Sequence, residues 1–155
     1  MSTERVKAYF RTKGMEERIQ EFETSSATVA LAAQALNCEE KRIAKTLSFH
    51  VGEKVVLVVT AGDAKIDNPK YKATFSQKAT MLSFEEAATL VGHEVGGVCP
   101  FGVNEGVRIF LDVSLKEYDT VYPAAGNAGS AVELTPSELE AILPTAKWVD
   151  VCKVK

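Results

Sequence analysis

The stretch of chain best suited to chemistry is a glycine-rich loop over residues 92–102, GHEVGGVCPFG. Two adjacent glycines, Gly96 and Gly97, precede Pro100, and glycine lets a backbone approach a ligand with no Cβ in the way. Backbone N–H groups presented in this manner can polarise a carbonyl or hold an oxyanion. The alternative is a plain connection between a helix and a strand, because paired glycines are common in such loops.

Lys45 is the second candidate, because it stands at the start of an apolar strand. We expect its side chain to face away from Leu47, Phe49 and Val51. A lysine held there would act as a compact positive charge for a phosphate or a carboxylate. The alternative is an ordinary solvated lysine at a strand edge, which is where most lysines are found.

Cys99 lies inside the glycine loop, six residues after His93, so a cysteine hydrolase has to be considered. A catalytic cysteine needs a neighbour that favours the thiolate, and the spacing offers no convincing base with an orienting partner. The alternative is a small buried residue, since cysteine is often buried. Cys38, Cys99 and Cys152 show no CxxC spacing, so neither a disulfide framework nor a metal site is expected, and no cofactor is predicted.

Helical periodicity and capping signals predict the helices around these residues. Ser83 with Glu86 and Thr135 with Glu138 have the spacing of capping boxes, and the same spacing at Ser114 predicts a single turn. The predicted helices cover residues 3–13, 25–37, 67–75, 83–92 and 135–143.

Extended apolar runs predict strands over 45–51, 54–62, 107–113, 120–125, 130–134 and 147–151, with a weaker one near 19–22. The runs 45–51 and 54–62 are joined by a short turn and predict an antiparallel hairpin. Residues 55–59, VVLVV, are typical of a central strand covered on both faces. Because strands and helices do not alternate regularly, we expect one α+β domain over 1–155, with a mixed, largely antiparallel sheet flanked by helices.

Charge and composition exclude several classes of protein. The 155 residues are 46% hydrophobic and 25% charged, which predicts a folded globular chain. Eighteen basic against twenty-one acidic residues, a net charge of −3, argue against coating nucleic acid by bulk charge. The longest apolar run, at 55–59, is far too short to cross a membrane, and the N-terminus has no apolar signal segment. We therefore expect a cytoplasmic protein with neither a membrane nor DNA as partner.

Four motifs together resemble a known family. RIAKTLSF (42–49), VVLVVTAGDAKID (55–67), GHEVGGVCPFG (92–102) and AAGNAGSAVELTPSEL (124–139) occur in the order and at the separations found in the YbaK-type family. That family comprises the free-standing relatives of the editing domain inserted in bacterial prolyl-tRNA synthetases. The similarity covers nearly the whole chain.

The resemblance implies an aminoacyl-tRNA deacylase, which hydrolyses the ester joining a wrong amino acid to the terminal adenosine of a tRNA. It implies that Lys45 contacts the 3′ end and positions the ester, and that Gly96 and Gly97 belong to the reaction centre. The attacking group would be a substrate hydroxyl, a substrate thiol or water. The implied partners are prolyl-tRNA synthetase and the acceptor end of a tRNA, with the tRNA for proline as the first candidate. The implied substrate-binding residues are Val98, Pro100, Phe101, Gly102, Gly129 and Ser130.

One position departs from the family pattern. Ala131 stands where some cysteine-removing relatives carry an acidic residue, so the resemblance does not fix which amino acid is removed. A second class of function stays open: a binding module that holds a tRNA end, a nucleotide or an aminoacyl-adenylate without turnover. The presence of both Lys45 and the glycine loop favours the enzyme.

Overall fold

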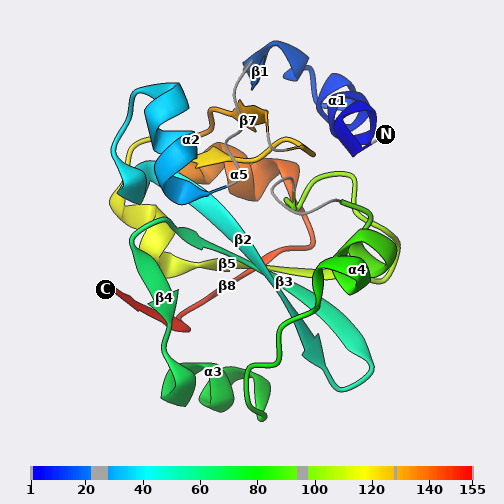
Figure 1. The fold of residues 1–155 in the computed structure, drawn as a ribbon, viewed down its shortest axis with the longest axis vertical. Coiled ribbons are helices and arrows are strands. Elements are labelled where there is room, and N and C mark those ends of the chain that lie inside the picture. The colour runs from blue at the N-terminus through cyan, green and yellow to red at the C-terminus, as the bar shows by residue number, and fades with distance from the viewer. Residues whose placement is uncertain (1, 22–27, 94–97, 128, 155) are drawn as a thin grey trace.

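The computed structural model describes residues 2–21, 28–93, 98–127 and 129–154. Its centre is a five-stranded sheet with the strand order β6-β2-β3-β5-β8 (Figure 1). These strands are β2 (Ile43–Val51), β3 (Lys54–Ala61), β5 (Arg108–Asp112), β6 (Tyr122–Pro123) and β8 (Lys147–Val149). Two smaller sheets pair β1 (Ile19–Glu21) with β7 (Ser130–Val132), and β4 (Ala64–Ile66) with β9 (Cys152–Val154).

Strands β2 and β3 form the predicted antiparallel hairpin. The register runs from Val51 opposite Lys54 to Ala44 opposite Ala61. Gly52 takes φ +62° in the turn, a backbone conformation that favours glycine. From Val56 onward every residue of β3 is buried, as predicted for a central strand.

The mixed α+β architecture is confirmed, but the antiparallel share of the main sheet is smaller than expected. Within that sheet only β2 and β3 are antiparallel, whereas β2–β6, β3–β5 and β5–β8 are parallel. Each parallel pair needs a long crossover, and the segment between β3 and β5 supplies one through α3 (Asn68–Phe75) and α4 (Phe84–Glu86). The short strands β4 and β9 were not predicted, because three residues are too few to show a period of two.

The predicted helices are all present. Besides α3 and α4 they are α1 (Ser2–Thr12), α2 (Val29–Leu36) and α5 (Pro136–Ile142), and α4 continues as a wider π-helical turn, η3 (Ala87–Val91). Short 3₁₀ turns are η1 (Glu16–Arg18), η2 (Glu40–Arg42) and η4 (Val113–Glu117). No helix of the described ranges is long and apolar enough to cross a membrane.

Local sequence signals set the ends of these helices. Thr28 accepts a hydrogen bond from Leu31 N at the start of α2, and Asn37 ends it with φ +54°. Both predicted capping boxes are formed, at α4 and at α5. At η4 the predicted single turn is present but its cap is different: the Asp112 side chain accepts from Ser114 N at 2.9 Å. A carboxylate one residue before the turn is a strong N-cap and replaces the expected hydroxyl.

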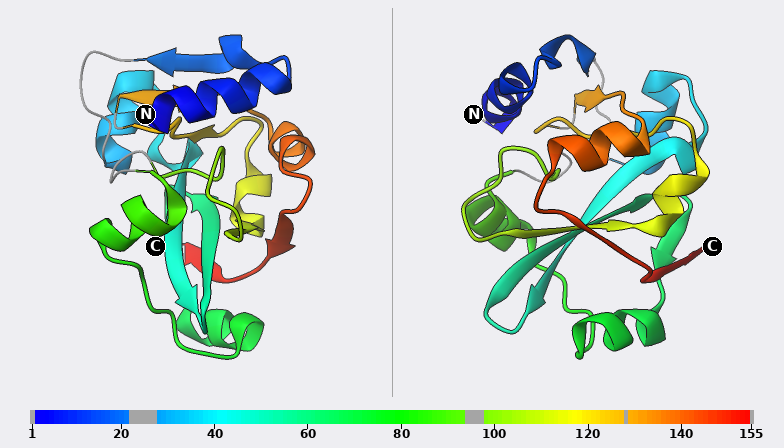
Figure 2. Two further views of the ribbon diagram at one scale, coloured as in Figure 1. Left: turned by 90° about the vertical axis from the view of Figure 1, so that its right-hand side faces the viewer. Right: turned by 180° about the vertical axis from the view of Figure 1, so that it is seen from behind.

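Two helices pack at opposite ends of the molecule (Figure 2). α3 covers one face of the sheet, where the ring centroids of Tyr71 and Phe49 are 5.0 Å apart. α1 lies beside β1 and against the segment that follows η3, with the Phe10 and Phe101 ring centroids 4.7 Å apart. Arg5 of α1 adds a hydrogen bond from Nη1 to the Gly92 carbonyl at 3.3 Å.

Candidate functional site

A pocket of about 210 Å³ lies at the outer edge of β2. Its walls come from α2, β2, the start of α4, the segment at Val98, and β6–β7. The described lining residues are Thr28, Val29, Ala32, Ile43, Ala44, Lys45, Thr46, Ser48, Met81, Leu82, Ser83, Phe84, Ala87, Val98, Tyr122, Ala124, Ser130 and Ala131.

Among the residues that the structure describes, the outer edge of β2 has a gap in its hydrogen bonding, and the pocket lies at this gap. At one end β2 pairs with β6 at Ile43 and Ala44. Farther along the strand, the backbone carbonyl of Ser48 accepts a hydrogen bond from Leu82 N at 3.1 Å, and His50 N donates to the Thr80 carbonyl at 2.8 Å. Because alternate residues of a strand direct their N–H and C=O groups to the same side, Thr46 directs both groups outward as well. The gap therefore presents one backbone donor and one acceptor to the pocket.

Thr46 also contributes its side chain. The Oγ1 atom is buried and has no hydrogen-bond partner among the residues that the structure describes. A buried hydroxyl without a partner costs about 1–3 kcal/mol, and a ligand oxygen in the pocket would remove that cost. The sequence did not single out Thr46, since a polar residue alternating with apolar ones is typical of a solvent-facing strand surface.

Lys45 lines the pocket and its ammonium is hydrogen-bonded. Nζ donates to the carbonyl oxygen of Ala64 in β4. The expectation that Lys45 faces away from Leu47 and Phe49 is wrong, because residues two apart in a regular strand share a face. The contact to Ala64 therefore ties the cation to the short strand β4 rather than leaving it in solvent.

The remaining predicted site residues divide into three groups. Val98 and Ser130 line the pocket with Lys45, and Gly96 and Gly97 lie outside the described residues. Those that do not line this pocket are Pro100, Phe101, Gly102 and Gly129.

Two of the latter have structural roles under α1. Phe101 is fully buried against Phe10, so its ring belongs to the core and not to a substrate surface. Gly102 takes φ +61°, and a Cβ there would lie 3.2 Å from the Arg5 carbonyl oxygen. The two residues hold α1 against the loop, which explains their place in the motif without substrate contact.

Cys99 is a buried core residue, as its alternative interpretation predicted. Its side chain is 0% exposed, and burial raises the pKa of the thiol to about 12. The sulfur lies 3.6 Å from His93 Nε2, but that nitrogen also lies 2.7 Å from the Phe101 carbonyl oxygen. A carbonyl only accepts, so Nε2 carries the proton and cannot take one from the thiol. Burial also lowers the pKa of His93, which keeps the imidazole neutral.

The described lining is mostly small and apolar. Five alanines face the pocket, and none of the described lining residues carries a carboxylate. Ala131, the position at which some cysteine-removing relatives carry an acidic residue, is 3% exposed. The described residues also hold no group of three or more His, Cys, Asp or Glu side chains placed to bind a metal.

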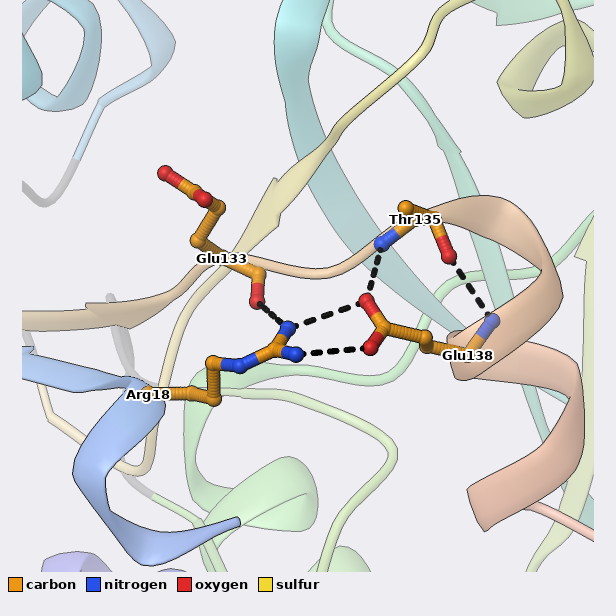
Figure 3. Close-up of polar contacts among 4 residues, drawn as sticks. All are labelled: Arg18, Glu133, Thr135 and Glu138. Carbon is orange, nitrogen blue, oxygen red and sulfur yellow. Dashed lines mark hydrogen bonds and ion pairs between the residues drawn. The ribbon is translucent and has the colours of Figure 1, made fainter.

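A charged network supports the β7 wall (Figure 3). The Arg18 guanidinium donates two hydrogen bonds to the Glu138 carboxylate, at 2.9 and 2.8 Å, and a third to the Glu133 carbonyl at 3.3 Å. Glu138 also accepts from Thr135 N at 3.0 Å as part of the capping box. The pKa of Glu138 is lowered to about 2. The hydrogen bond from Arg18 is the largest cause, and the backbone N–H of Thr135 is the next. This network fixes α5 to the segment that carries Ser130 and Ala131.

A second hollow, of about 460 Å³, opens where β3, β5 and β8 begin. Lys54, Arg108 and Lys147 line it, and none of the predicted site residues does. The candidate site is therefore the pocket at β2.

The fold is thus an α+β domain with a pocket at the outer edge of β2, and comparison with known proteins gives its family. The chain belongs to the family of the aminoacyl-tRNA editing domain, whose model matches residues 23–142. Among curated proteins, the uncharacterized protein YwhH of Bacillus subtilis is 51% identical over 154 residues, 99% of this chain and 98% of that protein.

Two further similar proteins have names that refer to prolyl-tRNA synthetase or its reaction. The proline–tRNA ligase of Bacillus cytotoxicus is 36% identical over 78 residues, which cover 50% of this chain but only 14% of the ligase. A solved structure described as "a putative trans-editing enzyme for prolyl tRNA synthetase" superposes with a TM-score of 0.88 at 29% identity. That superposition covers 98% of this chain and 97% of the other.

Proposed function

We propose that this chain is a trans-acting aminoacyl-tRNA deacylase. Its reaction is hydrolysis of the ester between an amino acid and the 3′ end of a tRNA, with the tRNA for proline as the first candidate. The observation that carries the proposal is the pocket at β2 in a chain of the editing-domain family. Lys45 and Thr46 both line it, and Thr46 has no side-chain hydrogen-bond partner among the described residues.

The chemistry asks little of the protein. A water molecule adds to the ester carbonyl and the bond to the ribose oxygen breaks, so that the amino acid leaves with a free carboxyl group and the ribose oxygen takes up a proton. A substrate hydroxyl or thiol that attacked first would give a transferred or cyclic ester, which water must then open. Positioning and carbonyl polarisation can each lower such a barrier by several kcal/mol. Thr46 would orient the ester through its edge groups, and the Lys45 ammonium would attract the phosphate or carbonyl oxygens beside it.

The lining suggests which amino acids are removed. Alanine side chains leave room for a small group, and without a carboxylate among the described lining residues a cationic side chain would have no counter-charge. We propose a small uncharged amino acid attached to the wrong tRNA. One methylene in such a pocket changes selectivity by about 10- to 200-fold. The enzyme would act in the cytoplasm, where aminoacyl-tRNA and prolyl-tRNA synthetase occur together.

A panel of charged tRNAs tests the proposal. The pure protein is incubated with tRNA for proline carrying alanine, cysteine, serine or proline, and with correctly charged alanine tRNA, and release of amino acid is followed over time. We expect release from one mischarged tRNA well above the buffer rate and little from the correct pairs. Tight binding with no release from any member would favour the binding module instead.

A further inference from the structure

The mouth of the β2 pocket carries two large apolar side chains that the fold leaves in solvent. Phe84 is 72% exposed and Met81 is 56% exposed, and both line the pocket. Single exposed hydrophobic residues are ordinary on a protein surface. Two of them that line one pocket are less ordinary, and we call this pair the Phe84 ledge (Met81 and Phe84).

The Phe84 ledge is held on a rigid support. Leu82, between its two members, is buried, and its N–H donates to a β2 carbonyl at 3.1 Å. Ser83 and Glu86 form the capping box of α4, with hydrogen bonds of 3.1 and 2.8 Å. The Glu86 carboxylate also lies 2.9 Å from His50 Nε2 of β2. The Phe84 ring is therefore presented by a segment anchored at several points.

The size of the pocket shows why a ligand would need this ledge. Pockets that enclose drug-sized ligands measure about 300–1,000 Å³, whereas this one measures about 210 Å³. An aminoacyl group fits within that volume, but an aminoacyl group with its nucleoside does not. If the aminoacyl group enters, the base of the terminal nucleotide stays at the mouth, beside Phe84.

The charges near the ledge favour a base over a phosphate. Glu85 is exposed next to Phe84, and the hydrogen bonds of Glu86 with Ser83 and His50 lower its pKa, so it is ionised at neutral pH. Two carboxylates repel a phosphate but do not repel the neutral face of a base. Aromatic side chains stack on bases with little dependence on sequence.

We propose that Phe84, with Met81 beside it, stacks on the terminal nucleobase of the tRNA and so positions the ester over the pocket. This inference rests on the proposed deacylase function. Phe84 is thus a substrate-binding residue that neither the glycine loop nor the lysine motif indicates.

Two small substrates isolate the contribution of the base: the 3′-alanyl ester of adenosine, and the same ester of a ribose that lacks a base. We expect the wild-type protein to hydrolyse the adenosine ester with a kcat/KM about fivefold to 150-fold higher, the range expected for one stacked base. Phe84→Ala should lose this preference, so that it hydrolyses the two esters with nearly equal kcat/KM. Phe84→Tyr should keep the preference.

Leu90→Ala is the matched control, since Leu90 is 40% exposed on the neighbouring turn η3 but does not line the pocket. A full base preference in Phe84→Ala, an equal loss on both esters, or no preference in the wild type would each overturn the stacking role. If the wild type hydrolyses neither ester nor any mischarged tRNA, the deacylase function itself fails and the stacking role fails with it.

Discussion

Lys45 is the residue on which the proposed chemistry depends most. Lys45 lines the pocket and its ammonium is hydrogen-bonded to the Ala64 carbonyl, so the charge has a defined place before a substrate arrives. A charge fixed in advance needs no reorganisation when the ester reacts, which is the condition under which such groups contribute most to catalysis.

Lys45→Ala should reduce deacylation by about 100-fold or more, the effect typical of removing one preorganised polar group. Lys45→Arg should also be slow, because a planar guanidinium does not replace a compact ammonium. Single-turnover rates measure the loss, and circular dichroism with a melting curve monitors the fold. A folded Lys45→Ala protein within severalfold of the wild-type rate would show that the lysine is not part of the chemistry.

Cys99→Ser tests the cysteine-hydrolase alternative. Because Cys99 is buried and the pKa of its thiol is raised to about 12, the serine variant should keep most of its activity. Iodoacetamide at neutral pH should label Cys99 slowly, since the thiolate is the reactive form. An inactive but folded variant, or a trapped acyl-enzyme on Cys99, would contradict the mechanism.

At the scale of elements, the pocket depends on segments that are distant in sequence. α1 is held on the loop around Gly102, and β7 is held on α5 and η1 by the Arg18 network. Neither contact involves a residue that lines the pocket, yet both hold in place the elements that carry lining residues.

Gly102→Ala should destabilise the protein by more than Gly52→Ala. The two glycines have nearly the same backbone, φ +61° and +62°, so the conformational strain of about 1–2 kcal/mol is shared. Only at Gly102 would the new Cβ press on α1, 3.2 Å from the Arg5 carbonyl oxygen, whereas at Gly52 nothing lies within 4 Å. Urea denaturation measures both, and equal losses would mean that α1 does not pack closely on this loop.

Glu138→Gln should lower the melting temperature at pH 7 by about 2–4 °C. The folded-state pKa of Glu138 is lowered to about 2 from an ordinary value of 4.5, so its contribution is present above pH 4.5 and is lost as the pH falls towards 2. The difference in melting temperature between wild type and variant should therefore shrink across that window. Glu140→Gln on the same helix is the control, and a difference that stays constant down to pH 2 would contradict the assignment.

At the scale of the whole molecule, local signals in the sequence predicted the elements well. The hairpin and the capping boxes at Ser83 and Thr135 were confirmed, because each depends on neighbours within a few residues. The parallel pairing of β5 and β8 was not predicted, since crossover direction is decided by packing between distant segments.

The pocket was predicted only in part for the same reason. Lys45, Val98 and Ser130 were named from motifs and do line it. Thr46 and Phe84 also line it but were not singled out, because their place in the pocket depends on the sheet edge and on the position of α4, which no local pattern encodes. Phe101 was named from the same motif but is fully buried and does not line the pocket, since a motif does not distinguish a residue that faces a pocket from one that packs beneath it.

The most direct test of the account is to fill the pocket and measure the single-turnover rate of ester hydrolysis. Ala32 lines the pocket from α2, whereas Ala35 of the same helix does not, and leucine suits a helix nearly as well as alanine. With the mischarged tRNA that the wild type hydrolyses fastest, Ala32→Leu should be slower by about 10- to 200-fold, and Ala35→Leu should stay within about twofold of wild type, both folded. Hydrolysis by Ala32→Leu at the wild-type rate, or no hydrolysis of any mischarged tRNA by the wild type, would contradict the claim that this pocket is a deacylase site.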